Sequence, residues 1–197
     1  MNPLLAKMSP TATRLIRMDH SHVMTQFHKL EPGLSRTARE ATVRNICAAL
    51  EIHAQLEEEI FYPALRETGA ELPQLEHSVP EHDEMRGLIE RVRSLEAQPD
   101  AQQLALNDLM RAVIHHVAEE ETSLLPAAEQ RLADRLAELG ARMTERRMEL
   151  AKPHAGQIAA DMARSSPGTA ALVVAGTVAA GALLLGSLKR SKDKHHA

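Results

Sequence analysis

The stretch HAQLEEEIFYPA at residues 53–64 returns 63 positions later as HVAEEETSLLPA at residues 116–127. Both copies place a histidine four residues before a glutamate, and residues four apart in an α-helix lie on one face, one turn from each other. Two such pairs on facing helices, each joined by one more histidine, are able to hold two transition-metal ions inside a helix bundle. The repeat therefore predicts a metal-binding protein built from two matching halves.

The helical face that carries His53 and Glu57 is otherwise apolar, with Ile46, Leu50 and Ile60. This face is expected to point into the core. A lone histidine there would usually be a hydrogen-bonded core residue, but a buried glutamate is costly without a partner. A metal ion accounts for both, because it takes an imidazole nitrogen and a carboxylate oxygen as ligands and supplies the opposite charge.

Each half of the chain offers one further histidine directly behind an acid. Asp19-His20 and Glu81-His82 are 62 positions apart, nearly the 63 of the longer repeat. We expect both histidines to be ligands, and we expect Asp19 and Glu81, which point elsewhere, to be surface or capping groups. The predicted ligand set is His20, His53, Glu57, His82, His116 and Glu120.

This donor set restricts the metal. Four imidazoles and two carboxylates without a thiolate suit iron or manganese and also admit zinc or copper. Two glutamates are able to bridge two ions, which then lie about 3.5–4 Å apart. The single Cys47 excludes an intramolecular disulfide and a thiolate zinc site, and is interpreted as a small buried residue in a reducing compartment.

Composition and helix signals predict an all-α fold. Aromatic residues make up only 2% of the chain, so Leu, Ala and Met must fill the core, which favours helices. Four main helices with short loops predict an up-down four-helix bundle over residues 10–151, with a short fifth helix. The third helix begins either at a capping box around Ser78 or at Pro73 with a kink near Pro80. The other helices are expected over residues 10–30, from Ser35 to about Arg66, from Pro99 past Leu124, and over 132–151.

The end of the chain has a different character. Residues 152–167 are expected to be a linker, 168–188 a hydrophobic helix and 189–197 a basic tail. The 24 residues from 165 to 188 carry no charge, and a bilayer-spanning helix needs about 20. We expect the 168–188 segment to span or associate with a membrane; the alternative is a weakly hydrophobic tail packed on the domain or left mobile.

Location and partners follow from the same patterns. No signal peptide is evident at the N-terminus, which favours a cytoplasmic metal-binding domain. The basic tail also favours a cytoplasmic C-terminus. The metal-binding domain and the C-terminus lie on the same side of the membrane only if the hydrophobic segment is re-entrant or lies in the membrane interface; otherwise the chain departs from the positive-inside rule. A net charge of −4 without a basic stripe argues against nucleic acid as a partner. Gly176 and Ala180 are compatible with a homodimer.

On its paired motifs, Asp19-His20 with Glu81-His82 and the two His-x3-Glu-Glu segments, the chain resembles the hemerythrin-like family of HHE cation-binding domains over about residues 10–150. The resemblance implies a four-helix bundle with two non-haem iron ions, manganese or zinc being alternatives.

The chain also departs from that family's pattern. Oxygen carriers of the family use five histidines, with two of them four apart on the third helix. Here His77 and His82 are five apart with Pro80 between them, so His77 is held open as an additional ligand, and an exposed residue is the alternative. Oxygen carriers also have an aspartate a little beyond the position of Glu120. The pattern is closer to members that resemble iron sensors or act on peroxide or nitric oxide.

Three functions are compatible with these residues. The first is a di-iron protein that binds or senses oxygen, nitric oxide or iron. The second is a di-iron enzyme with peroxidase, catalase-like or oxidase activity, whose ligand would be peroxide or a small diatomic molecule. The third is a membrane-tethered scaffold stapled by metal. Near the predicted ligands, Glu58 and Glu121 are expected to be solvated or to support the ligands. Tyr62 is expected to pack in the core with a solvated hydroxyl, and the alternative is that its hydroxyl donates a hydrogen bond to the ligands.

Overall fold

The structure is a computed structural model and describes residues 8–30, 33–69, 72–154, 156 and 160–161. All regular secondary structure in this part of the chain is helical, so the predicted all-α class is confirmed. None of the helices among these residues is both long and apolar enough to cross a bilayer. The hydrophobic helix and basic tail expected over 168–197 lie outside the described residues.

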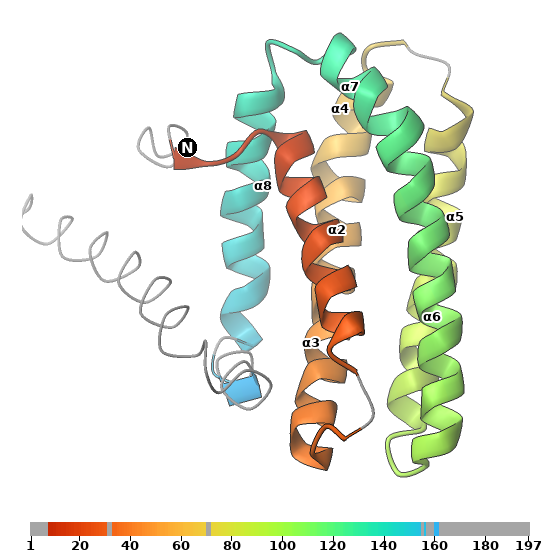
Figure 1. The fold of residues 1–197 in the computed structure, drawn as a ribbon. Coiled ribbons are helices and arrows are strands. Elements are labelled where there is room, and N and C mark those ends of the chain that lie inside the picture. The colour runs from red at the N-terminus through yellow and green to blue at the C-terminus, as the bar shows by residue number, and fades with distance from the viewer. Residues whose placement is uncertain (1–7, 31–32, 70–71, 155, 157–159, 162–197) are drawn as a thin grey trace, which may run out of the picture.

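Long helices pack antiparallel in a bundle, and one further helix, α8, lies along its side (Figure 1). α8 packs against α2 and α3, while α5 packs chiefly against α6. In chain order the elements are α2 (Ala12–His28), α3 (Arg36–Leu56), the π-helical η1 (Glu57–Phe61), α4 (Tyr62–Arg66), α5 (Pro73–Ser94), α6 (Pro99–Glu119), the π-helical η2 (Glu120–Leu124), α7 (Leu125–Arg131), α8 (Leu136–Ala151) and the 3-10 turn η3 (Lys152–His154).

The start of α5 decides between the two alternatives left by the sequence. The helix begins at Pro73, in the first turn, where its missing N–H is not needed. Ser78 is therefore not a cap: its hydroxyl donates to the carbonyl of Gln74 at 2.8 Å, one turn back. Pro80 lies inside the helix, where it cannot donate the usual backbone hydrogen bond.

The two helices that carry the His-x3-Glu repeat, α3 and α6, both change to π-helix at the same position of the repeat. α3 gives way to η1 at Glu57, and α6 gives way to η2 at Glu120. Each π turn closes with a hydrogen bond over five residues, from the Tyr62 N–H to the Glu57 carbonyl and from the Leu125 N–H to the Glu120 carbonyl. Such turns are rare and concentrate at functional sites. The sequence predicted both helices as continuous and did not reveal the π turns.

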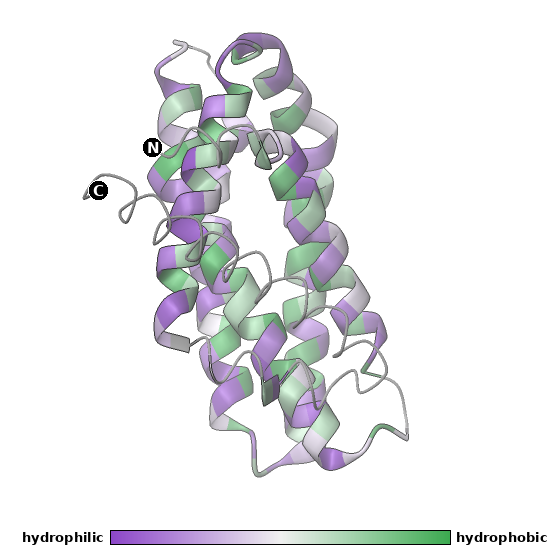
Figure 2. Cartoon of the chain, turned by 90° about the vertical axis from the view of Figure 1, so that its left-hand side faces the viewer, coloured by the Kyte–Doolittle hydropathy of each residue, from purple (hydrophilic) through white to green (hydrophobic). Residues whose placement is uncertain are grey.

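A polar layer divides the apolar core into two clusters. On α2, Ile16 belongs to one cluster and Val23 to the other. On α3, Leu56 belongs to the first cluster and Leu50 to the second. The polar layer crosses both helices between these residues. Figure 2 shows hydrophilic and hydrophobic bands alternating along the helices, as expected for helices with one buried face. The predicted histidine and glutamate ligands occupy this layer.

A glycine lets α8 approach the start of α2. A Cβ atom at Gly140 would overlap the carbonyl oxygen of Pro10 and lie 2.8 Å from the backbone nitrogen of Ala12. Both obstacles are backbone atoms, which cannot rotate away as a side chain can. The contact therefore requires glycine at position 140.

We predict that Gly140→Ala lowers the free energy of unfolding by about 1–3 kcal/mol, because overpacking against a fixed backbone forces the helices apart. Gly87→Ala is the control: its position on α5 is exposed, with nothing within 4 Å of an added Cβ, and alanine favours helix by up to about 1 kcal/mol. Urea unfolding measures both. Equal stabilities for the two variants would contradict the close packing of α8.

Candidate metal centre

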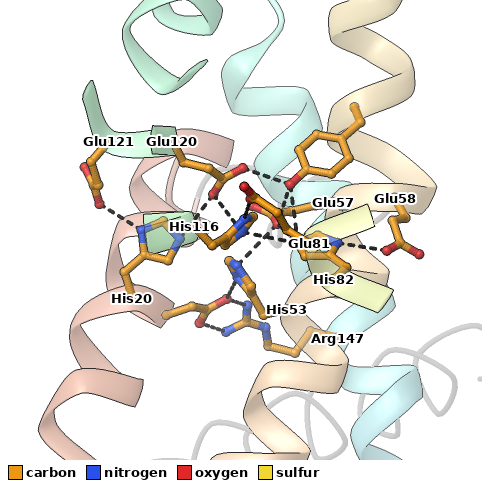
Figure 3. Close-up of polar contacts among 12 residues, drawn as sticks. His20, His53, Glu57, Glu58, Glu81, His82, His116, Glu120, Glu121 and Arg147 are labelled. Atoms are coloured by element: carbon orange, nitrogen blue, oxygen red, sulfur yellow. Dashed lines mark hydrogen bonds and ion pairs between the residues drawn. The ribbon is translucent and has the colours of Figure 1, made fainter. Parts of the chain in front are cut away.

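The six predicted ligands meet in the polar layer, and each is at most 5% exposed (Figure 3). Two groups of four buried residues have ligand atoms that all lie within 4.8 Å of one another. The first group is His53, Glu57, His82 and His116. The second group is His20, His53, Glu57 and Glu120. Four segments distant in sequence thus converge on one buried cluster.

The histidines form two pairs. The ring centroids of His20 and His53 are 5.0 Å apart, and those of His82 and His116 are 4.7 Å apart. His53 lies 6.3 and 6.2 Å from the two rings of the other pair. One pair comes from α2 and α3 and the other from α5 and α6, so the arrangement follows the two halves of the sequence repeat.

The two glutamates lie between the pairs. Glu57 Oε2 is 3.2 Å from His53 Nε2 and 3.3 Å from His82 Nε2. Glu120 Oε2 is 3.3 Å from His20 Nε2 and 3.6 Å from Nε2 of the histidine one turn before it. Each carboxylate therefore faces one histidine of each pair, as a ligand shared by two ions would.

Several of the atoms that point inward lack partners. Among the described residues, the buried side-chain atoms without a hydrogen-bond partner include Nε2 of His20 and His53, Oε1 of Glu57 and Oε2 of Glu120. The Nε2 atoms of His82 and His116 instead lie 3.2 Å from each other. Buried polar groups are normally paired, and leaving them unpaired is costly. Cations placed between these nitrogen and oxygen donors would satisfy them, and the donor set suits iron, manganese or zinc. The residues therefore fit a pair of transition-metal ions.

Two of the histidines are held from outside by acids of the opposite half. His20 Nδ1 lies 2.9 Å from Glu121 Oε1, and His82 Nδ1 lies 2.8 Å from Glu58 Oε1. Each of these acids directly follows a predicted ligand glutamate. Of the two roles that the sequence left open for them, the structure supports the role of holding the ligands.

The other two histidines face acids of their own half. His116 Nδ1 lies 2.8 Å from Glu81 Oε2, and His53 Nδ1 lies 3.5 Å from Asp19 Oδ2. The prediction that Asp19 and Glu81 are surface or capping groups is wrong. Neighbouring residues on a helix point about 100° apart, and here that turn directs each acid toward the adjacent helix instead of solvent. Their near-equal spacing in the repeat was the signal for this role.

These contacts define how each ring is presented. At His20, His82 and His116 an outer carboxylate accepts a hydrogen bond from Nδ1–H and leaves the Nε2 lone pair directed inward, which orients the ring and raises its basicity toward a metal. At His53 the carboxylate of Asp19 lies farther from Nδ1, at 3.5 Å, which is an ion-pair distance without a hydrogen bond. All four rings turn Nδ1 outward and Nε2 inward. The centre is therefore preorganised for cations at Nε2.

Tyr62 breaks the symmetry of the centre. Its side chain is fully buried, and its hydroxyl lies 3.0 Å from Glu57 Oε2 and 2.8 Å from Glu120 Oε1. The expectation of a solvated hydroxyl is wrong, because Tyr62 directly follows the π turn η1 and its side chain is buried in the core. The matching position in the other half is Leu125. A comparison of the two repeat copies could have identified this difference.

The centre holds protons when no cation is bound. Burial and the charge of Glu120 raise the pKa of Glu57 well above its usual value. Burial lowers the pKa of His20, but hydrogen bonding to Glu120 and nearby carboxylate charges outweigh it and raise that pKa to about 9. Burial lowers the pKa of His53 to about 4, although Asp19 opposes it. At neutral pH the raised pKa of His20 keeps this imidazole protonated beside the buried carboxylates.

Two features lie outside this centre. His77 is exposed near the start of α5 and belongs to neither buried group, so the structure gives it no place beside the other ligands. A cavity of about 1030 Å³ runs along the outer side of α3. Its described lining reaches Glu58 and Arg86, but includes none of the six predicted ligands.

Comparisons with known proteins agree with this geometry. Residues 11–128 match the family described as Hemerythrin HHE cation binding domain. A protein named DNA nickase from Nostoc sp. is 28% identical over 119 residues, which is 60% of this chain and 34% of that relative. The chain thus spans about a third of the relative's length. No solved structure matches the chain.

We predict that metal binding releases protons and strengthens as the pH rises. With its pKa raised to about 9, His20 is charged at neutral pH, and only its neutral form binds a cation. Affinity should therefore rise about tenfold per pH unit for each proton displaced, and should level off above about pH 9.

Titration of the metal-free chain with Co²⁺ between about pH 6.5 and 8.5 measures this slope. His77→Gln, which alters an exposed histidine outside the centre, should leave the slope unchanged. An affinity independent of pH would contradict the protonated state of the metal-free centre.

Proposed function

The chain belongs to the hemerythrin HHE cation-binding domain family, and from that membership we propose that it is a non-haem di-iron protein that binds or senses dioxygen, nitric oxide or iron. Cation binding is the function of the family and agrees with the histidine and glutamate cluster. The observation that carries the finer proposal is the buried double set of donors, in which every histidine is backed by its own carboxylate.

The residues divide between two ions. His20 and His53 would hold one ion, the second histidine pair would hold the other, and Glu57 and Glu120 would be shared. Bound iron would supply exchangeable electrons and open coordination positions. Two carboxylates balance part of the charge of two divalent or trivalent ions, and nitrogen and oxygen donors suit iron. Manganese or zinc are the alternatives that the donor set admits.

Burial of the centre supports a small ligand. The six donors are at most 5% exposed, and the cavity along α3 has none of them in its described lining. A large organic substrate would have to open the bundle to reach these atoms. A diatomic gas or peroxide needs only the small fluctuations of packed helices, so we propose such a molecule as the physiological ligand.

A second function, turnover of peroxide, is favoured by Tyr62. Its hydroxyl lies within 3.0 Å of both shared carboxylates in a water-poor site. The hydroxyl is placed to donate to one of these carboxylates and to supply a proton that reduction of peroxide would consume.

The proposal includes no nucleic-acid partner. The chain carries a net charge of −4, whereas nucleic-acid interfaces are strongly positive. The name DNA nickase describes a Nostoc protein of which the match covers 34%. The nicking activity therefore belongs to a protein that is mostly outside the comparison.

We further propose that the metal-binding domain is cytoplasmic and is tethered to a membrane by residues 168–188. The support is the uncharged run of 24 residues from 165 to 188, which has the length of a membrane-spanning helix. The small residues Gly176 and Ala180 in this run would allow two copies to pack closely as a homodimer.

To test the function, we would load the full chain with ferrous iron without air and then add dioxygen, nitric oxide or peroxide while recording the optical spectrum. We expect near-stoichiometric spectral changes with the gases. Tyr62→Phe should keep gas binding but lower peroxide turnover about 10²-fold, since it removes a general acid.

Phe61→Leu alters the neighbouring buried ring without removing a hydroxyl, and is the control for packing. A spectrum that no added ligand changes would refute the proposed function and leave the metal as a structural staple. Peroxide turnover unchanged in Tyr62→Phe would remove the case for the second function.

To test the tether, the full chain would be floated with lipid vesicles in a density gradient. We expect it to float with the vesicles. Val178→Arg should reduce recovery, because a charge at the centre of a span costs about 2.5–3.5 kcal/mol. Met148→Arg, which adds the same charge on the exposed side of α8, is the control. Equal recovery of both variants would favour a tail that does not enter the bilayer.

A further inference from the structure

Helix α8 lies beyond the part of the chain that defines the family. The family match ends at residue 128, and α8 spans Leu136–Ala151. It packs along α2 and α3 (Figure 1), the two helices that carry the His20–His53 pair. α8 also contacts η1, which begins at Glu57, but it packs chiefly against the two helices that carry this pair.

One side chain of α8 reaches the shell of the centre. The guanidinium of Arg147 donates from Nη1 to Asp19 Oδ1 at 2.7 Å and from Nη2 to Asp19 Oδ2 (Figure 3). Asp19 Oδ2 in turn lies 3.5 Å from His53 Nδ1. A two-pronged contact of this kind fixes the plane of a carboxylate, which a single ammonium would not do.

Helix packing explains why Arg147 reaches that far. Gly140 and Arg147 are seven residues apart, two turns of helix, and so lie on the same face of α8. Met143, between them, is 1% exposed and belongs to the apolar cluster shared with α2. The close approach at Gly140 thus brings this face against α2, where Asp19 is located.

Other outer carboxylates are held from within the family's part of the chain. Arg86 donates to both oxygens of Glu58 at 2.7 and 2.8 Å, and Arg17 donates to Glu121 at 2.9 Å. Among the described residues, α8 is the element beyond residue 128 that contributes such an arginine. That arginine binds Asp19, the outer carboxylate of His53. The contact between Asp19 and His53, at 3.5 Å, is the longest of the four contacts between a histidine Nδ1 and its outer carboxylate.

The orientation of Asp19 depends on this contact, because both of its oxygens accept from Arg147. Asp19 is only 16% exposed at its side chain, so it has little water to replace a lost guanidinium. Without Arg147, the carboxylate would turn toward whatever solvent it can reach and away from His53.

We propose that α8 is a positioning element for the metal centre: through Arg147 and Asp19 it fixes the orientation of His53 and slows release of the ion held by the His20–His53 pair. Arg147 is thus a positioning residue that touches no metal. This inference rests on the proposed function, because it requires that the two histidine pairs bind cations.

The test uses the full chain loaded with Co²⁺, whose visible absorption reports its coordination, and follows release into excess EDTA. In Arg147→Leu we expect one of the two ions to leave about tenfold faster or more, the usual size of such an outer-shell effect, with the other unchanged. Arg147→Lys keeps the charge but loses the two parallel hydrogen bonds to Asp19, and should also accelerate release of that ion.

Arg146→Leu is the matched control. Arg146 neighbours Arg147 on α8 and pairs with Glu59 at 2.7 Å on the surface, so its removal should leave both release phases unchanged. Thermal melts of the metal-free variants verify that each remains folded. If Arg147→Leu folds poorly, Arg147→Lys alone provides the comparison with Arg146→Leu.

A double variant separates positioning from general stability. If Arg147 acts through Asp19, then Asp19→Asn with Arg147→Leu should release the ion no faster than Asp19→Asn alone, because coupled residues do not add. Additive acceleration, or release from both Arg147 variants equal to that of Arg146→Leu, would overturn the inference. A wild-type chain that bound no Co²⁺ would refute the proposed function as well.

Discussion

The structure depends on burying two carboxylates and four imidazoles in one layer between two apolar clusters. Carboxylates that cannot reach water need an opposite charge, and here protons or cations must supply it. The surrounding features serve this layer. An outer acid lies beside every Nδ1. The π turns begin at Glu57 and Glu120, where each helix presents a carboxylate inward. Arg17 and Arg86 then balance the outer acids Glu121 and Glu58.

The centre is nearly, but not fully, twofold. Both halves supply a histidine pair and two supporting acids at matching positions of the repeat. Tyr62 occupies the position that Leu125 has in the other repeat copy. Arg147 comes from a helix that lies outside the family match. Each departure adds a polar group on one side, the first at the shared carboxylates and the second behind His53.

Sequence spacing predicted the all-α fold and gathered the six candidate ligands, because helical periodicity assigns faces without reference to the partner helices. It did not predict which neighbour an outward-pointing acid meets, as with Asp19 and Glu81, since that depends on packing between helices. The π turns were missed for a different reason: the helices were predicted from α-helical spacing, which does not mark where a hydrogen bond spans five residues instead of four. The sequence left two starts for α5 open, because either proline is acceptable in a first helical turn, and the structure has the earlier one at Pro73.

The most direct test of the central claim is the metal content of the full chain, purified without added metal and measured by elemental analysis. We predict about two ions per chain, mainly iron, since two shared carboxylates and two histidine pairs define two positions. A variant with both His53→Ala and His116→Ala, which removes one histidine from each pair, should retain almost none. Full metal content in that double variant, or a wild-type chain without metal, would contradict the account.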